Sequence, residues 1–252
     1  MQQPLVILFL GLALSPIARA EGIADCPDLK PFTARYAVYR DHELAGETVS
    51  RLEALENGHY RYSVETYGTH GWARLLGVRI EESSEFMVHD NEVLPIHFKY
   101  RKAIALSTKK RSAVYNWSTR QAHGDGGDGP WSMHLDGPVT DKALVNFALM
   151  LSTCRGDQHP KFTVIKRGKA SPWTYRRDGR YKVPTPLGDF IGIRVDRIHP
   201  NPNRHTTTWH IPEFGFIAAR LDHDDPEDPP VSMLLMALER DGKSLHAQIE
   251  HD

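Results

Sequence analysis

Apolar and polar residues alternate along most of this chain, with a period of two. Between Phe190 and Arg197, the apolar Ile191, Ile193 and Val195 share one parity, and polar residues occupy much of the other. A period of two is typical of a β-strand with one dry face. The same reasoning predicts strands at 32–39, near 48–55, and at 60–66, 78–88, 93–100, 111–117, 161–166, 173–177, 181–183, 190–197, 206–211, 217–221, 231–240 and 245–249, with a turn at 212–216.

Turn signals separate these segments. Asn57-Gly58 is the strongest hairpin signal in the chain, and Asp90-Asn91 predicts a second turn. We also expect a turn at 44–47, a long irregular turn at 123–130, and an acidic, proline-rich loop at 222–230.

One segment has the pattern of a buried helix. Thr140 is a good N-cap residue, Asp141 would lie in the first turn, and 144–151 is apolar almost all round. The glycine-bounded segment 71–77 predicts either a short helix or an apolar lip on a loop. The sequence therefore predicts a mainly β protein: a single curved antiparallel sheet or half-open barrel, with one buried helix on its concave face.

The first twenty residues have the features of a secretory signal peptide. An apolar run from Leu5 to Leu14 is followed by Pro16 and by the small-x-small pattern Ala18-Arg19-Ala20. The run is too short to span a bilayer. We therefore expect cleavage after residue 20, a single β-rich domain over 21–252, a periplasmic location, and no membrane span after cleavage.

Charge gives no sign of a polyanionic partner. Loss of residues 1–20 removes one arginine and leaves 30 basic and 32 acidic residues. Such a balance predicts no general attraction to nucleic acid or anionic lipid. The sequence also predicts no cofactor.

The two cysteines, Cys26 and Cys154, are candidates for a disulfide, because an exported protein meets an oxidising compartment. The bond would tie the start of the mature chain to the end of the predicted helix. The alternative is two unrelated buried thiols.

Several segments, in this order, resemble one family of exported bacterial proteins. They are Ala45-Gly46-Glu47 after an aromatic strand, Leu94-Pro95 before Phe98, Thr140-Asp141 before an apolar helix, Thr185-Pro186-Leu187-Gly188, and Trp209-His210-Ile211-Pro212-Glu213-Phe214-Gly215. Over about 32–240 the chain is similar to the DUF3108 family. The resemblance implies an envelope protein rich in antiparallel β-structure, and it implies no reaction.

Catalytic motifs are missing from the sequence, so we predict no catalytic residue. Ser107 to Lys110 has a Ser-x-x-Lys spacing, but its flanks predict strand or loop, whereas the motif acts on a helix turn. The best metal-like cluster is Asp222, His223 and Asp224, a weak candidate that a solvated loop explains better. Gly126 to Gly129 resembles a single calcium β-roll repeat, and a plain turn explains it better.

A further set of candidate residues, for ligand binding, is apolar. If the sheet is curved, part of its concave face can line a pocket instead of a solid core. The candidates for ligand binding are Trp209, Phe214, Phe216, Trp72, Leu75 and Leu76, and ordinary core packing is the alternative.

Three functions remain open. The first is a non-catalytic periplasmic protein that binds an apolar ligand, such as a lipid, or a segment of another envelope protein in a concave groove. A lipid carrier needs an apolar cavity of roughly 300 Å³ or more. The second is an interaction module with a solid core. The third is a hydrolase of cell-wall or polysaccharide substrates, whose carboxylates would meet only in the fold.

Overall fold

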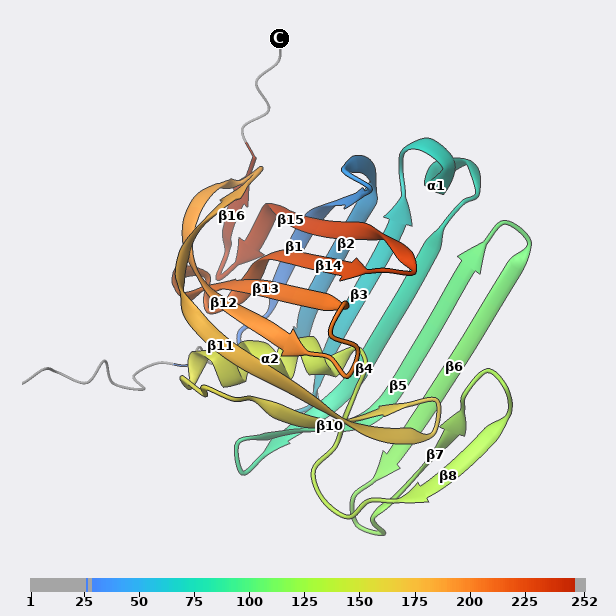
Figure 1. Cartoon of the computed structure of the whole chain (residues 1–252). Helices are drawn as coiled ribbons and strands as arrows, with labels where there is room; N and C mark the ends of the chain where they lie inside the picture. The colour runs from blue at the N-terminus through green and yellow to red at the C-terminus, as the bar shows by residue number, and fades with distance from the viewer. Residues whose placement is uncertain (1–25, 27–28, 248–252) are drawn as a thin grey trace, which may run out of the picture.

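The strands of the described residues form one sixteen-stranded sheet that curls around a helix (Figure 1). The computed structural model describes Cys26 and residues 29–247, so the predicted signal peptide lies outside the described residues. The pairing is antiparallel throughout except between β9 and β10. This arrangement confirms the predicted fold class, and the sheet does not close into a complete hydrogen-bonded barrel.

The first half of the sheet is a meander in which each strand pairs with the next. Its strands are β1 (Phe32–Arg40), β2 (Glu43–Ala54), β3 (Tyr60–Gly68), β4 (Arg79–His89), β5 (Glu92–Ile104), β6 (Ser107–Asn116), β7 (Gln121–Asp125) and β8 (Pro130–His134).

The second half is a meander from β10 to β16, extended by the parallel strand β9, and β15 pairs with β1 to join the two halves. Its strands are β9 (Thr140–Asp141), β10 (Lys161–Lys166), β11 (Lys169–Thr185), β12 (Gly188–Ile198), β13 (His205–Ile211), β14 (Ile217–Asp225), β15 (Asp228–Arg240) and β16 (Lys243–His246). The remaining elements are α1 (Gly71–Leu75), α2 (Leu144–Cys154) and the 3₁₀ turn η1 (Pro212–Phe214).

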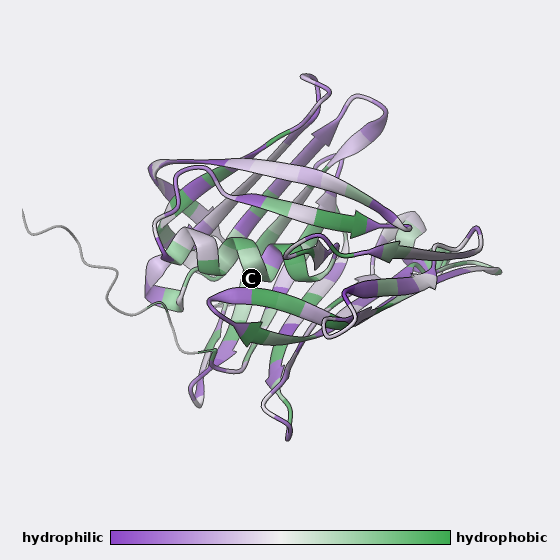
Figure 2. Ribbon diagram, turned by 90° about the horizontal axis from the view of Figure 1, so that it is seen from below, coloured by the Kyte–Doolittle hydropathy of each residue, from purple (hydrophilic) through white to green (hydrophobic). Residues whose placement is uncertain are grey.

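Helix α2 is the centre of the core, enclosed between the two halves of the sheet (Figure 2). Nine of its eleven residues are buried. The ring centroid of Phe147 lies 5.6 Å from that of Tyr62 on β3 and 5.2 Å from that of Phe86 on β4. A helix that is apolar almost all round can be accommodated only where the sheet covers it on more than one side.

The start of this helix differs from the prediction. Thr140 and Asp141 form the short strand β9, and it is the Asp141 carboxylate that accepts hydrogen bonds from the backbone N–H groups of Ala143 (2.9 Å) and Leu144 (2.8 Å). Thr140 is drawn into parallel pairing with Val164, so the predicted Thr140 N-cap is wrong. Asp141 satisfies the free N–H groups of the first helical turn instead.

Three predicted turns are also placed differently. Residues 44–47 lie inside β2, because the chain reverses at Asp41 and His42, which both have positive φ. The segment 123–130 ends β7 and begins β8 around a short turn, and 222–230 is mostly the β14–β15 hairpin. Polar and acidic residues are tolerated on these strands because they lie near hairpin ends. The Asn57-Gly58 and Asp90-Asn91 turns are confirmed.

A disulfide joins Cys26 to Cys154, whose Cα atoms are 5.4 Å apart. The bond fixes the chain just before β1 to the last residue of α2. It therefore links the start of the sheet directly to the helix at the centre of the core.

The two ends of the curled sheet meet through side chains. Gly168, in the turn between β10 and β11, lies against Trp131 of β8, and a Cβ atom on Gly168 would be 2.5 Å from the Trp131 Cγ atom. Ile165 of β10 packs in the same cluster as Ala113 and Tyr115 of β6. These contacts close the barrel on this side without backbone hydrogen bonds.

Replacing Gly168 by alanine tests this closure. We expect the substitution to lower the free energy of unfolding by about 1–3 kcal/mol more than Gly242→Ala does. Gly242 is a matched control, since its φ of +70° is close to the +71° of Gly168 but nothing lies within 4 Å of its added Cβ. The measurement is urea denaturation of both variants. Equal losses would mean that Trp131 does not hold the two ends together.

Candidate functional site

An apolar cavity of about 140 Å³ lies between α2 and the concave face of the sheet. One wall comes from β1 to β3, the second from β13 to β15, and α2 forms the third. The lining residues are Phe32, Tyr36, Thr48, Ser50, Tyr62, Val64, Thr66, Asn146, Phe147, Leu149, Met150, Thr208, His210, Ile217, Ala218, Arg220, Leu221 and Met233.

One end of the cavity is closed and carries a few hydroxyl groups. Tyr36 and Tyr62 are buried there beside Ser50. Burial raises the pKa of both phenols, that of Tyr62 to about 12, so both remain protonated near neutral pH. A dry wall with a few fixed hydroxyls is typical of sites that bind mainly apolar groups.

His210 on β13 is a second buried polar group in this lining. Its Nδ1 lies 2.9 Å from the Phe216 carbonyl oxygen, which can only accept, so Nδ1 carries the proton. Its Nε2 then accepts a hydrogen bond from the Thr208 hydroxyl at 3.0 Å. Burial lowers the pKa of His210 to about 4, although the bond to Phe216 acts against this, so the ring is neutral near pH 7.

The other end of the cavity is open to solvent. Val64 and Thr66 of β3 are half-buried there, as are Arg220 and Leu221 of β14, while Asn146 of α2 is exposed. Strands β3 and β14 are separated by three strands in the sheet, so they face each other across the curl. An apolar group can therefore enter between them.

Three buried carboxylates lie outside this cavity, and all have structural partners; Asp225 pairs with Arg204. Asp141 accepts a hydrogen bond from the Ser84 hydroxyl at 2.6 Å in addition to its two helix-capping bonds. Glu82 pairs with Lys142. Burial raises the pKa of Asp141 to about 7.

The buried His210 and Asp141 predict opposing pH effects. His210 loses its contribution to stability as pH falls from about 6.5 towards about 4, because the unfolded chain binds a proton first. Asp141 acts in the other direction, since its raised pKa adds stability as pH falls below about 7. We expect Asp141→Asn, which keeps the capping oxygen, to make the protein more acid-sensitive, and His210→Gln to make it less so. Urea denaturation at several pH values checks this, and parallel profiles for wild type and both variants would contradict it.

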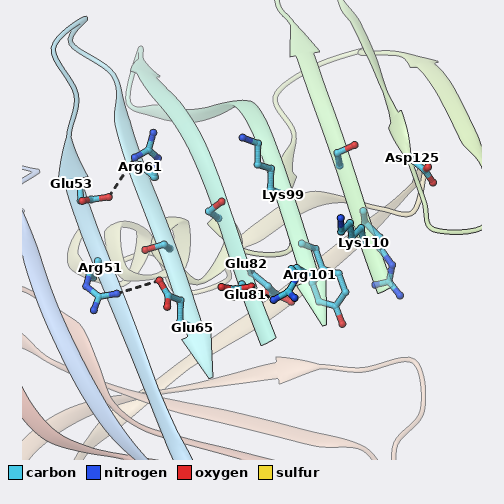
Figure 3. Close-up of a pocket in the computed structure, with 15 residues that line it drawn as sticks. Arg51, Glu53, Arg61, Glu65, Glu81, Glu82, Lys99, Arg101, Lys110 and Asp125 are labelled. Atoms are coloured by element: carbon cyan, nitrogen blue, oxygen red, sulfur yellow. Dashed lines mark hydrogen bonds and ion pairs between the residues drawn. The ribbon is translucent and has the colours of Figure 1, made fainter. Parts of the chain in front are cut away.

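A larger hollow, of about 840 Å³, lies on the outer face of β2 to β7 (Figure 3). Its charges are mostly paired across strands. Arg51 lies 3.4 Å from Glu65, Arg61 2.7 Å from Glu85, and Arg101 3.0 Å from Glu81. Cross-strand ion pairs of this kind stabilise a solvated sheet face, so this hollow is explained as surface without a ligand.

The structure separates the six predicted ligand-binding residues into two groups. Trp209, Phe214 and Phe216 pack against the core. The Arg220 guanidinium lies 5.2 Å from the Trp209 ring centroid, and Phe214 packs edge-on against Phe190 at 4.8 Å. None of the three lines the cavity, and Phe216 reaches it only by accepting the hydrogen bond from His210.

Trp72, Leu75 and Leu76 lie elsewhere, on and just after α1, and are exposed. The segment 71–77 is therefore both a short helix and an apolar lip. The cavity lining was missed in the sequence because it combines residues of six strands and of α2, and only the curl of the sheet brings them together.

The structure also locates the remaining candidates from the sequence, which are the acidic cluster, the Ser-x-x-Lys pair and the glycine-rich segment. Asp222, His223 and Asp224 lie on β14, where successive side chains point to opposite faces. Among residues 29–247 and Cys26, no three His, Cys, Asp or Glu side chains gather as metal ligands would. Ser107 and Lys110 lie on the strand β6, so their spacing does not bring them together as a helix turn would. Gly126 to Gly129 form the β7–β8 turn.

Family comparison agrees with the pattern of segments seen in the sequence. The family model described as "Protein of unknown function (DUF3108)" matches residues 32–225. The chain belongs to the DUF3108 family. No curated protein matches this sequence.

This DUF3108 protein is similar to three solved structures. A β-barrel-like protein of the family DUF1849 from Brucella abortus has a TM-score of 0.54 at 10% identity, covering 86% of this chain and 100% of its own. A candidate lipoprotein from Parabacteroides distasonis has a TM-score of 0.36 at 9% identity, covering 84% of this chain and 97% of its own. A candidate exported protein with a YmcC-like fold from Bacteroides fragilis has a TM-score of 0.31 at 8% identity, with the same coverage. The first of these supports an open β-barrel fold and says nothing of function.

In the part of the chain that the structure describes, no helix is long and apolar enough to cross a membrane.

Proposed function

We propose that this DUF3108 protein is a non-catalytic binding protein of the cell envelope that holds the apolar end of a ligand beneath α2. The observation that carries the proposal is the cavity between α2 and the sheet, closed at Tyr36 and Tyr62 and open between β3 and β14. The disulfide supports a location outside the cytoplasm, because such bonds persist in oxidising compartments.

The size of the cavity restricts the ligand. At about 140 Å³ it is smaller than the roughly 300 Å³ expected of a carrier that encloses a whole lipid. Apolar cavities of roughly 150 Å³ are known to take a molecule of the size of benzene. We therefore propose that the end of an acyl chain enters the cavity, while the polar part of the ligand stays outside near Asn146 and Arg220.

Methionine NMR provides a direct test, because Met150 and Met233 both line the cavity. With straight-chain fatty acids of increasing length as the probe, we expect the methyl signals of these two residues to shift. Ala218→Leu should block the shift, because Ala218 also lines the cavity. Ala54→Leu is the matched control, since Ala54 is exposed on β2 and lies outside the lining. No shift in the wild type, or equal binding by Ala218→Leu, would overturn the proposal.

A further inference from the structure

A group of large apolar side chains is exposed at one end of the sheet. Trp72 is 77% exposed, Leu75 72% and Leu76 42%, and Leu106 in the β5–β6 turn is fully exposed, at 105%. We name these four residues the apolar rim. Single exposed leucines are common on protein surfaces, but a group of this kind usually marks an interaction site.

The apolar rim is built on a fixed backbone. The Ala105 N–H donates to the Leu76 carbonyl at 2.7 Å, which joins the two turns that carry the rim. The N–H groups of Thr69 and His70 both donate to the Ala45 carbonyl, at 3.1 and 3.2 Å, so the start of α1 is held against β2. Figure 1 shows α1 and the β5–β6 turn at the same end of the sheet. The backbone of the apolar rim is therefore already ordered, so binding would cost little conformational entropy.

The two segments that carry the apolar rim have charges of one sign, and the nearest carboxylates on β2 are Glu43 and Glu47, on either side of Ala45. The chain contains no Asp or Glu between residues 66 and 80 or between residues 93 and 124. Arg74 lies within α1, and Lys102 stands opposite Lys109 across the β5–β6 hairpin. Directly opposed like charges destabilise a sheet, and an anionic partner would remove that cost.

The carboxylates at the nearby ends of β3 and β4 are already paired with other arginines. Glu65 pairs with Arg51, and Glu81 pairs with Arg79 and Arg101. Within residues 29–247 and Cys26, no carboxylate forms an ion pair with Arg74, Lys102 or Lys109. The near-zero charge of the whole chain therefore conceals a local basic region beside the apolar rim.

We propose that the apolar rim docks onto the surface of a lipid bilayer that carries anionic headgroups. Trp72, Leu75 and Leu106 would enter the boundary between headgroups and acyl chains, where tryptophan is favoured because its ring is amphipathic. Arg74, Lys102 and Lys109 would contact the headgroups. This docking goes beyond the binding of an apolar group in the cavity and does not depend on it. The two sites are neighbours, because α1 follows β3, whose Thr66 lines the mouth of the cavity.

The test is co-sedimentation with vesicles made of equal parts phosphatidylcholine and phosphatidylglycerol, compared with vesicles of phosphatidylcholine alone. We expect the wild type to bind the anionic vesicles, and added salt to weaken that binding. Lys102→Gln with Lys109→Gln should lower the partition coefficient roughly tenfold or more, since each basic residue at such a surface contributes about fivefold. Trp72→Ser with Leu106→Ser should lower it to a similar extent, roughly tenfold.

Ile191→Ser with Ile198→Ser is the matched control, because these isoleucines are 55% and 53% exposed and lie on β12, away from the rim. All these positions are exposed except Lys102, which is half-buried, and the circular dichroism spectrum of each variant verifies that it is folded. Quenching of tryptophan fluorescence by brominated lipid should be lost in Trp72→Phe.

Three results would overturn the proposal. The first is no binding to anionic vesicles at low salt, and the second is equal binding by the wild type and the rim variants. The third is a dimer in sedimentation that the rim substitutions dissociate, which would make the rim an interface between two copies of the chain.

Discussion

Reducing the Cys26–Cys154 disulfide is expected to lower the free energy of unfolding by about 4–5 kcal/mol, on the chain-entropy account of a long closed loop. The bond spans a sequence separation of 128 residues, so it removes much of the freedom of the unfolded chain. A loss of this size is a large share of the roughly 5–15 kcal/mol that stabilises a typical domain.

Urea denaturation with and without a thiol reductant measures this effect. The double variant Cys26→Ser, Cys154→Ser should resemble the reduced wild type, and reductant should have no effect on it. The same midpoint for oxidised and reduced wild type would show that the bond contributes nothing to stability.

Replacing Phe147 by alanine is expected to cost about 3–5 kcal/mol, the range for removing a buried aromatic side chain. The Phe147 ring lies against Tyr62 and Phe86 and also lines the cavity beneath α2. Its loss leaves a space that the surrounding sheet can fill only in part.

Asn146→Ala is the control for Phe147→Ala, because the neighbouring Asn146 is exposed on the same helix. It should change stability by less than about 0.5 kcal/mol. Urea denaturation measures both variants. A loss below about 1 kcal/mol for Phe147→Ala would show that the core collapses around the missing ring. The enlarged cavity should also accept a bulkier apolar probe in the methionine NMR experiment.

The strands could be predicted because each of them buries one face. Apolar and polar residues therefore alternate along the sequence of each strand. The 161–166 segment matches β10, and the apolar 144–151 segment falls within α2. The exact turns were less predictable. At Asp41-His42 the backbone takes a left-handed conformation without glycine, so the usual signal is weak.

The site was harder to predict than the fold. Tryptophan and phenylalanine at 209, 214 and 216 are conspicuous in the sequence, but they pack the core. The cavity depends on how far the sheet curls, and side-chain contacts such as Trp131 on Gly168 help to set that curl. The apolar lip at Trp72 was visible in the sequence, whereas the basic hairpin beside it is brought there by the pairing of β4 with β5 and by the bond between Ala105 and Leu76.

The pairing of β1 with β15 joins two strands that lie near opposite ends of the described chain, which affects how the protein folds. Phe32 is opposite Arg240 in this ladder, so one edge of the first strand stays open until a strand more than 190 residues later in the sequence has joined it. Contacts this distant in sequence make folding slow, and an open strand edge invites pairing with other chains. Pairing of β15 with β1 covers that edge and completes the sheet.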